Sequence, residues 1–246
     1  METFWNTIAA YNEGTWPVQI VWTLAGALLV VLLRLRPSRG VRIAMKLYMA
    51  GLNFWIAGVY YLIYCGQRQH NDMLALFWAI MGGIWIYDLA ARNASLARTG
   101  HHPHFALPLM LMLMPLVYPA VSLLLGRSFP MMTSPVMPCS VAVFTVGLML
   151  AFSERVNIVL AMFLCHWALI GLSKVYYFGI PEDYLLAGSV VPALFVFFRE
   201  YVTERSGRPG KPSPRVLNAL LALLCTIIAL CIVATLLHQF DLFTEL

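Results

Sequence analysis

Charged residues are scarce in this sequence. Of its 246 residues only 11% are charged, whereas 61% are hydrophobic, and the mean hydropathy is +0.78. A soluble domain of this size carries roughly 25% charged residues. The remaining polar surface is too small to cover a water-facing globule, so we predict that most of the outside faces lipid. The 16 basic residues are split among short loops, which argues against the basic face of a nucleic-acid-binding protein.

Paired cysteines and a signal peptide are also missing. The five cysteines form no CxxC and lie in apolar stretches, which argues against a disulfide framework. The first 15 residues contain Glu2 and Glu13 but no lysine or arginine. The basic region that begins a signal peptide is therefore absent, and we expect no cleaved signal.

Catalytic and metal-binding motifs are lacking as well. No HExxH, Walker-type loop, GxSxG or transmembrane double-aspartate pattern occurs, so we predict no catalytic residue and no enzyme. His101, His102 and His104 flank Pro103, which breaks helical ligand spacing. Soft metals also favour methionine and cysteine, but methionine is common in apolar segments. We predict no metal site, and no cofactor follows from the sequence.

Long apolar runs take the place of these features. A membrane-spanning helix needs about 20 mostly apolar residues. Helix is the expected structure because lipid leaves every backbone polar group to be satisfied internally, and no alternating barrel pattern appears. We predict an all-α transmembrane bundle of about eight spans. The windows are Trp16–Leu33, Val41–Cys65, Asp72–Ala91, Phe105–Gly126, Val136–Phe152, Asn157–Phe178, Tyr184–Phe198 and Val216–His238.

The basic residues favour one side of this arrangement. Thirteen of the 16 flank the odd-numbered connections, against Arg68, Arg127 and Lys174 on the other side. Basic loops tend to stay in the cytoplasm. We therefore predict that the odd connections are cytoplasmic and that the N-terminus and the C-terminus both lie outside.

Four segments are predicted along the chain. Residues 1–15 carry apolar side chains at helical spacing, typical of an interfacial helix. A seven-span membrane body follows over residues 16–202. Residues 203–215 are rich in proline, glycine and serine and form a cytoplasmic linker. Residues 216–246 form a peripheral last span and an external tail.

Polar residues inside the predicted spans are the candidates for function, because such residues are costly in lipid. In the second span Lys46, Asn53 and Tyr60 recur every seven residues, which places them on one stripe of a helix. In the sixth span His166 and Lys174 share a face, and a histidine there can pass a proton near neutral pH. The alternatives are a snorkelling lysine and structural hydrogen bonds from Asn53 and His166.

The third predicted span has two further features. Asp88 lies near its cytoplasmic end, four residues before Arg92, and we expect these two side chains to pair. Ala75, Ala79 and Gly83 form a ridge of small residues, typical of close helix packing.

Five different short stretches along the chain contain aromatic, proline or acidic residues. They are Tyr11-Asn12-Glu13 with Trp16-Pro17, Gly58-Val59-Tyr60-Tyr61, Pro138-Cys139 followed by Phe144-Thr145 and Gly147, Trp167 with Ile170-Gly171, and Pro181-Glu182-Asp183. Together they resemble a bacterial multi-pass membrane family known as domain of unknown function 6064. The resemblance implies a bacterial inner (cytoplasmic) membrane protein and implies no activity. The second span of the family tends to have histidine after tyrosine, where this chain has Tyr61, so no imidazole role is carried over there.

The predicted topology puts the polar parts of these stretches on the outer side. Glu13 lies there at the start of the first span, and Glu182 and Asp183 lie at the start of the seventh. We predict an outward-facing polar vestibule that narrows toward His166 and Asn53. Helix-end chemistry is the alternative, because acidic side chains stabilise helix N-termini.

These patterns predict a channel or transporter for a small ion or solute. The first alternative is a non-catalytic subunit or sensor of a larger membrane assembly, and the second is a membrane-embedded enzyme. Expected partners are the lipid bilayer, the transported ion or solute, and a second copy or another membrane subunit, with no nucleic acid. The residues predicted along the path are Lys46, Asn53, Tyr60, His166, Lys174, Glu13, Cys139, Glu182 and Asp183.

Overall fold

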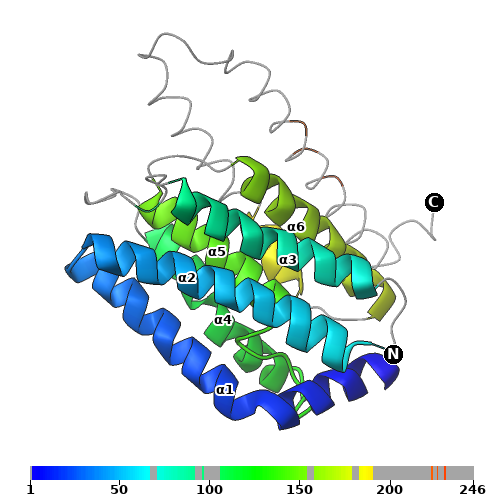
Figure 1. The fold of residues 1–246 in the computed structure, drawn as a ribbon. Helices are drawn as coiled ribbons and strands as arrows, with labels where there is room; N and C mark the ends of the chain where they lie inside the picture. Colours follow the sequence, from blue (N-terminus) through cyan, green and yellow to red (C-terminus); the bar gives the residue numbers. More distant parts are fainter. Residues whose placement is uncertain are drawn as a thin grey trace. The chain divides into compact units, whose positions relative to one another are not determined.

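The computed structural model describes residues 2–66, 71–91, 96, 106–153, 158–178, 183–190, 223, 226 and 230. The chain divides into two compact units, Met1–Glu154 (unit 1) and Arg155–Leu246 (unit 2). Among the described residues every regular element is a helix, so the predicted all-α class is confirmed (Figure 1).

The helices follow the predicted windows. The first six windows all contain helix, and apart from the early start of α1 their ends agree within a few residues. In the last two windows residues 184–190, 223, 226 and 230 are helical, and the remainder lies outside the described residues. The elements are α1 (Glu2–Leu35), α2 (Arg39–Trp55), the π-helix η1 (Ile56–Tyr64), α3 (Asn71–Ala90), α4 (Ala106–Leu124), α5 (Pro138–Phe152) and α6 (Ile158–Phe178).

The first helix is longer than a membrane is thick. α1 has 34 residues and contains Pro17, so at about 1.5 Å per residue it measures roughly 50 Å. It changes direction partway in Figure 1, as expected where proline removes a backbone hydrogen bond. The N-terminal segment predicted to be interfacial therefore belongs to the same helix as the first predicted span.

Local signals explain where several helices begin and end. The Ser38 hydroxyl accepts a hydrogen bond from the Val41 backbone N–H at 3.2 Å and caps α2. Gly126 has φ +80° just beyond α4, a left-handed conformation that suits glycine at a helix end. Pro138 lies in the first turn of α5, where its missing N–H costs no helical hydrogen bond.

Two helix pairs dominate the packing of unit 1, α2 with α3 and α4 with α5. α5 is buried along its whole length, as expected for a helix that is apolar on every side. The predicted ridge on α3 is wrong at one position. Gly83 is exposed and has no neighbouring atom within 4 Å of an added Cβ, whereas at Gly82 that atom would lie 2.9 Å from the Phe54 ring. The close approach of α2 and α3 therefore falls one residue earlier than predicted.

Apolar side chains cover much of the outer surface. Leu28 is 59% exposed and Leu124 is 86% exposed, a pattern that suits lipid rather than water. Within the described residues four helices are long and apolar enough to cross a membrane, namely Phe4–Leu35, Arg39–Tyr64, Asn71–Ala90 and Ala106–Leu124. Pro138–Phe152 and Val159–Leu172 are apolar but shorter.

Candidate functional site

A buried ion pair joins α2 to α3. Lys46 Nζ lies 2.9 Å from Asp88 Oδ2, and the two side chains are only 7% and 4% exposed. Lys46 also donates to the backbone carbonyl of Asp88 at 3.4 Å. The partner predicted for Asp88 was Arg92, which lies outside the described residues. The pairing with Lys46 could not be predicted because Lys46 is 42 residues away along the chain, and only the packing of α2 against α3 brings the two together.

A second polar contact marks the other end of the same helix pair. Asn71, at the start of α3, donates from Nδ2 to the backbone carbonyl of Tyr61 in η1. α2 and η1 thus run antiparallel to α3. Buried polar side chains therefore tie the two helices together at both ends of their interface.

Between these two contacts lie polar atoms without a partner. Asn53 Nδ2 donates to the Met49 carbonyl of its own helix at 2.6 Å, but Asn53 Oδ1 accepts no hydrogen bond from any residue that the structure describes. Trp85, one turn before Asp88 on the same face of α3, is buried, and its Nε1 donates to no described residue either. Buried polar atoms are nearly always satisfied. Asn53 Oδ1 on α2 and Trp85 Nε1 on α3 are therefore an acceptor and a donor whose hydrogen-bonding capacity no described residue uses.

The π-helix continues α2 toward the Asn71 contact. In η1 the hydrogen bonds span five residues, as in that from the Cys65 N–H to the Tyr60 carbonyl at 3.0 Å. Tyr60 and Tyr61 are both buried, although α-helical spacing places Tyr61 off the stripe of Lys46 and Asn53. η1 therefore buries two successive tyrosines, and π-helical turns are frequent at functional sites.

A cluster of aromatic residues surrounds Tyr11 at the same end of unit 1. The Tyr11 hydroxyl donates to the Val136 carbonyl at 2.7 Å and accepts from Trp55 Nε1 at 3.1 Å. Its ring makes edge contacts with Tyr60 and Tyr64, with centroids 5.0 Å and 5.6 Å away. Tyr11 is not among the residues predicted along the path. In the sequence it is marked only by its place beside Asn12 in the first of the five short stretches that resemble the family.

Asn12 fastens the same end of α1 to the loop before α5. Its Nδ2 donates to the carbonyls of Pro130 and Met132, both at 2.8 Å. Three of the five family-like stretches, those at Tyr11, Tyr60 and Pro138, therefore belong to segments that meet at one end of unit 1.

The two candidates on α6, in unit 2, are placed differently from each other. His166 is exposed, and its Nδ1 lies 2.9 Å from the Met162 carbonyl one turn earlier. Exposed Val159 and Met162 precede it on α6. The sequence predicts that His166 faces an interior, whereas its side chain is exposed in this unit. Lys174 is half-buried, and its Nζ lies 4.5 Å from the centroid of the Trp167 ring, a cation–π contact.

The residues predicted for the vestibule are distributed over both units. Glu13 is exposed on α1 and Cys139 is buried in α5, both in unit 1. Asp183 is buried in unit 2, where an added Cβ at Gly171 would lie 3.9 Å from Asp183 Cβ. Glu182 lies outside the described residues. The vestibule therefore stays a prediction.

Metal ligands do not gather in the part of the chain that the structure describes. No three histidine, cysteine, aspartate or glutamate side chains come together there in a group that could hold a metal ion. Cys65, Cys139 and Cys165 are buried and form no disulfide bond within the described residues. His101, His102, His104, Cys225 and Cys231 lie outside the described residues.

Comparison with known proteins identifies the family. A family model described as a family of unknown function (DUF6064) matches residues 1–208, so the resemblance inferred from the five short stretches is confirmed. No curated protein and no solved structure matches the chain. Because the match covers most of the sequence, including all of the described part of unit 1, the chain belongs to the family DUF6064.

Proposed function

We propose that this protein is a membrane transporter or channel for a small ion, and that the interface of α2 and η1 with α3 forms its path. The observation that carries the proposal is the Lys46–Asp88 ion pair, buried in two helices that are long and apolar enough to cross a membrane. Ionisable residues inside membrane spans commonly belong to ion pathways and proton relays.

The buried Lys46–Asp88 pair is not explained by its contribution to the stability of the fold. Removing two charges from water costs several kcal/mol per ion, and well-packed apolar residues often stabilise a protein as well or better. A charged pair that serves the fold only would be readily replaced. A pair that binds or passes an ion must keep its charges.

Asn53 and Trp85 extend the pair toward the other end of the interface. Asn53 lies seven residues after Lys46, or about 10 Å along α2, and its Oδ1 has no partner among the described residues. That distance is too long for direct transfer between the two side chains, so water between them would carry the ion or proton. Beyond Asn53, η1 supplies Tyr60, whose ring contacts Tyr11.

The same proposal includes eight membrane crossings in a bacterial inner membrane, with both termini outside. The excess of basic residues at the odd-numbered connections supports this orientation. Single cysteines at exposed Ser128 and exposed Pro37, in a cysteine-free background, test it. We expect an impermeant thiol reagent to label the Ser128→Cys protein in intact cells and to leave the Pro37→Cys protein unlabelled. The reverse pattern would overturn the orientation.

Replacing Asn53 by leucine is expected to lower ion flux at least about tenfold, which corresponds to about 1.4 kcal/mol in the transport barrier. The substitution removes a carbonyl oxygen that has no described partner, so we expect the protein to fold with unchanged or higher stability. Proton flux into proteoliposomes, driven by a potassium diffusion potential and followed with an internal pH dye, measures the effect. Sodium and potassium fluxes are measured in parallel.

Thr145→Val is the matched control for this substitution. Thr145 is fully buried in α5, and its hydroxyl donates to the Val141 carbonyl of its own helix at 2.7 Å. This change also removes a buried polar group, but away from the α2–α3 interface, so flux should stay at the wild-type level. Equal flux in the Asn53→Leu and Thr145→Val proteins would reject the path.

One observation favours a second function, that of a non-catalytic subunit of a membrane assembly. His166 is exposed beside exposed Val159 and Met162, and an imidazole is costly on a lipid-facing surface. Contact with another subunit would satisfy it. Absence of ion flux from the wild-type protein, together with a stable complex that His166→Leu disrupts, would favour this alternative over transport.

A further inference from the structure

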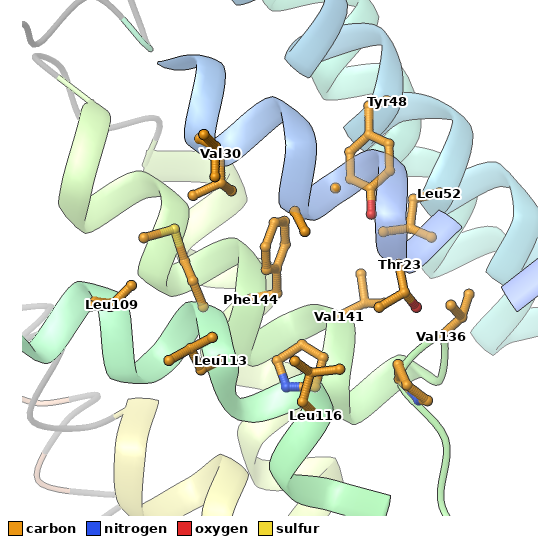
Figure 2. Close-up of a pocket in the computed structure, with 16 residues that line it drawn as sticks. Thr23, Val30, Tyr48, Leu52, Leu109, Leu113, Leu116, Val136, Val141 and Phe144 are labelled. Carbon is orange, nitrogen blue, oxygen red and sulfur yellow. The ribbon is translucent and has the colours of Figure 1, made fainter. Parts of the chain in front are cut away.

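A pocket of about 200 Å³ lies inside unit 1, among α1, α2, α4, α5 and the loop before α5. In Figure 2, Val30 and Thr23 of α1 lie across the space from Leu113 and Leu116 of α4, with Phe144 of α5 between them. Along α1 the lining extends from Thr23 to Val31, which is about 12 Å of helix. The pocket is therefore elongated along α1.

The walls of the pocket suit a hydrocarbon chain. None of the 16 residues that line it is charged. The two side-chain hydroxyls already have acceptors, because Tyr48 donates to the Trp22 carbonyl at 3.0 Å and Thr23 donates to the Gln19 carbonyl at 2.7 Å. A polar solute would lose hydrogen bonds to water here without replacement, whereas an apolar chain would lose none.

The rim of the pocket belongs to the exposed apolar surface. Val31 of α1 is 50% exposed and Leu113 of α4 is 48% exposed, and both residues line the pocket. Both lie in helices that are long and apolar enough to cross a membrane. A lipid tail could therefore enter from the side without passing through water.

Arginines follow directly at one end of the pocket. Arg34 lies three residues after Val31 and four after Val30, on the same face of α1. Arg36 is exposed in the turn between α1 and α2, Arg39 is exposed at the first position of α2, and Arg42 follows in its first turn. The sequence contains no acidic residue between Glu13 and Asp72. The N–H groups of an arginine guanidinium can donate two parallel hydrogen bonds to the oxygens of one phosphate, so these arginines are suited to bind an anionic headgroup.

We propose that unit 1 binds one anionic phospholipid, with an acyl chain in the pocket between α1 and α4 and the headgroup phosphate on the arginines of the α1–α2 turn. Val31 lines the pocket and Arg34 follows three residues later on α1, about 4.5 Å along the helix, so a single lipid molecule could contact both. Basic clusters next to membrane spans are typical of anionic-lipid recognition. The proposal depends on neither the ion path nor the orientation of the chain.

Native mass spectrometry of the full-length protein, titrated with dioleoyl phosphatidylglycerol or dioleoyl phosphatidylcholine, tests the site. We expect phosphatidylglycerol to bind about tenfold more tightly, because it carries a net negative charge that the arginines attract, whereas the choline group of phosphatidylcholine neutralises its phosphate. Ala27→Trp and Leu113→Trp fill the pocket from opposite walls, and each should weaken phosphatidylglycerol binding about tenfold. Arg36→Gln with Arg39→Gln should remove the preference for the anionic lipid.

Leu24→Trp is the matched control, because Leu24 is exposed on α1 but does not line the pocket, and it should leave binding unchanged. Circular dichroism shows whether each variant is folded. If one of the two pocket variants does not fold, the other is used alone to test the acyl site. Equal affinity for the two lipids would overturn the headgroup site. Unchanged binding of phosphatidylglycerol to the folded pocket variants would overturn the acyl site. A change in the proportion of dimer in these variants, without a change in bound lipid, would also overturn it and would identify a second copy of the chain as the occupant of the pocket.

Discussion

Replacing Asp88 alone by leucine is expected to lower the free energy of unfolding by about 3–5 kcal/mol, because it leaves the Lys46 ammonium buried without its charge partner. Lys46→Met alone should cost a similar amount, since Asp88 is then the uncompensated charge. Lys46 Nζ and Asp88 Oδ2 are 2.9 Å apart and nearly inaccessible. Equilibrium unfolding in mixed detergent and dodecyl sulfate micelles, followed by circular dichroism, measures the loss.

The double variant Lys46→Met with Asp88→Leu should regain most of that stability. It buries two apolar side chains of similar volume and leaves no charge behind, an exchange that is often neutral or stabilising. Asp72→Leu is the control, because Asp72 is an exposed acid in the first turn of the same helix. A loss in the Asp88→Leu protein no larger than that in the Asp72→Leu protein would show that the charges are not buried together.

Gly147→Ala is expected to lower the free energy of unfolding by about 1–3 kcal/mol through overpacking. An added Cβ would lie 2.8 Å from Leu111 Cβ, 2.9 Å from the Met112 backbone nitrogen and 2.9 Å from the Pro108 carbonyl oxygen. Two of these atoms belong to the backbone of α4 and cannot turn aside. α4 and α5 would have to separate along the most extensive helix contact in unit 1.

Gly83→Ala is expected to have the opposite effect on the free energy of unfolding in the same assay. Gly83 lies within α3, and nothing would meet an added Cβ within 4 Å. Alanine there should raise the free energy of unfolding by about 0.5–1 kcal/mol, since glycine weakens a helix interior. Equal effects of the two substitutions would contradict the close packing of α4 on α5.

Hydropathy predicted the helices well but could not predict their partners. Long apolar runs mark helices directly, because lipid permits few other structures, and six windows match α1 to α6. Which small residue packs against which neighbour depends on helix rotation. The ridge on α3 was therefore assigned through Gly83, whereas the neighbouring Gly82 faces Phe54.

The candidate site was only partly predictable for the same reason. Polar residues are rare in apolar runs, and this rarity identifies Lys46, Asn53 and Tyr60 in the sequence as candidates. All three side chains are buried. Their partners come from distant parts of the chain, such as Asp88 for Lys46. Tyr11 is one aromatic residue among many in the sequence, and its contacts with Trp55 and Val136 follow only from the fold.

His166 shows the limit of arguments from position along a span. Its depth in the sixth window suggested an interior role, but a helix has both an inner and an outer face. Rotation of α6 leaves His166 exposed, while Trp167 and Cys165 beside it are buried. Depth alone therefore does not distinguish an ion path from a contact surface.

Proton and cation flux through the Lys46→Met, Asp88→Leu double variant tests the central claim most directly. This variant is expected to keep most of the stability of the wild type, so a change in flux through the folded protein reports on the charges themselves. If the buried pair belongs to the ion path, reconstituted wild-type protein conducts and the double variant does not, while the Thr145→Val protein conducts normally. Wild-type flux through a folded double variant would show that the Lys46–Asp88 pair has no part in transport.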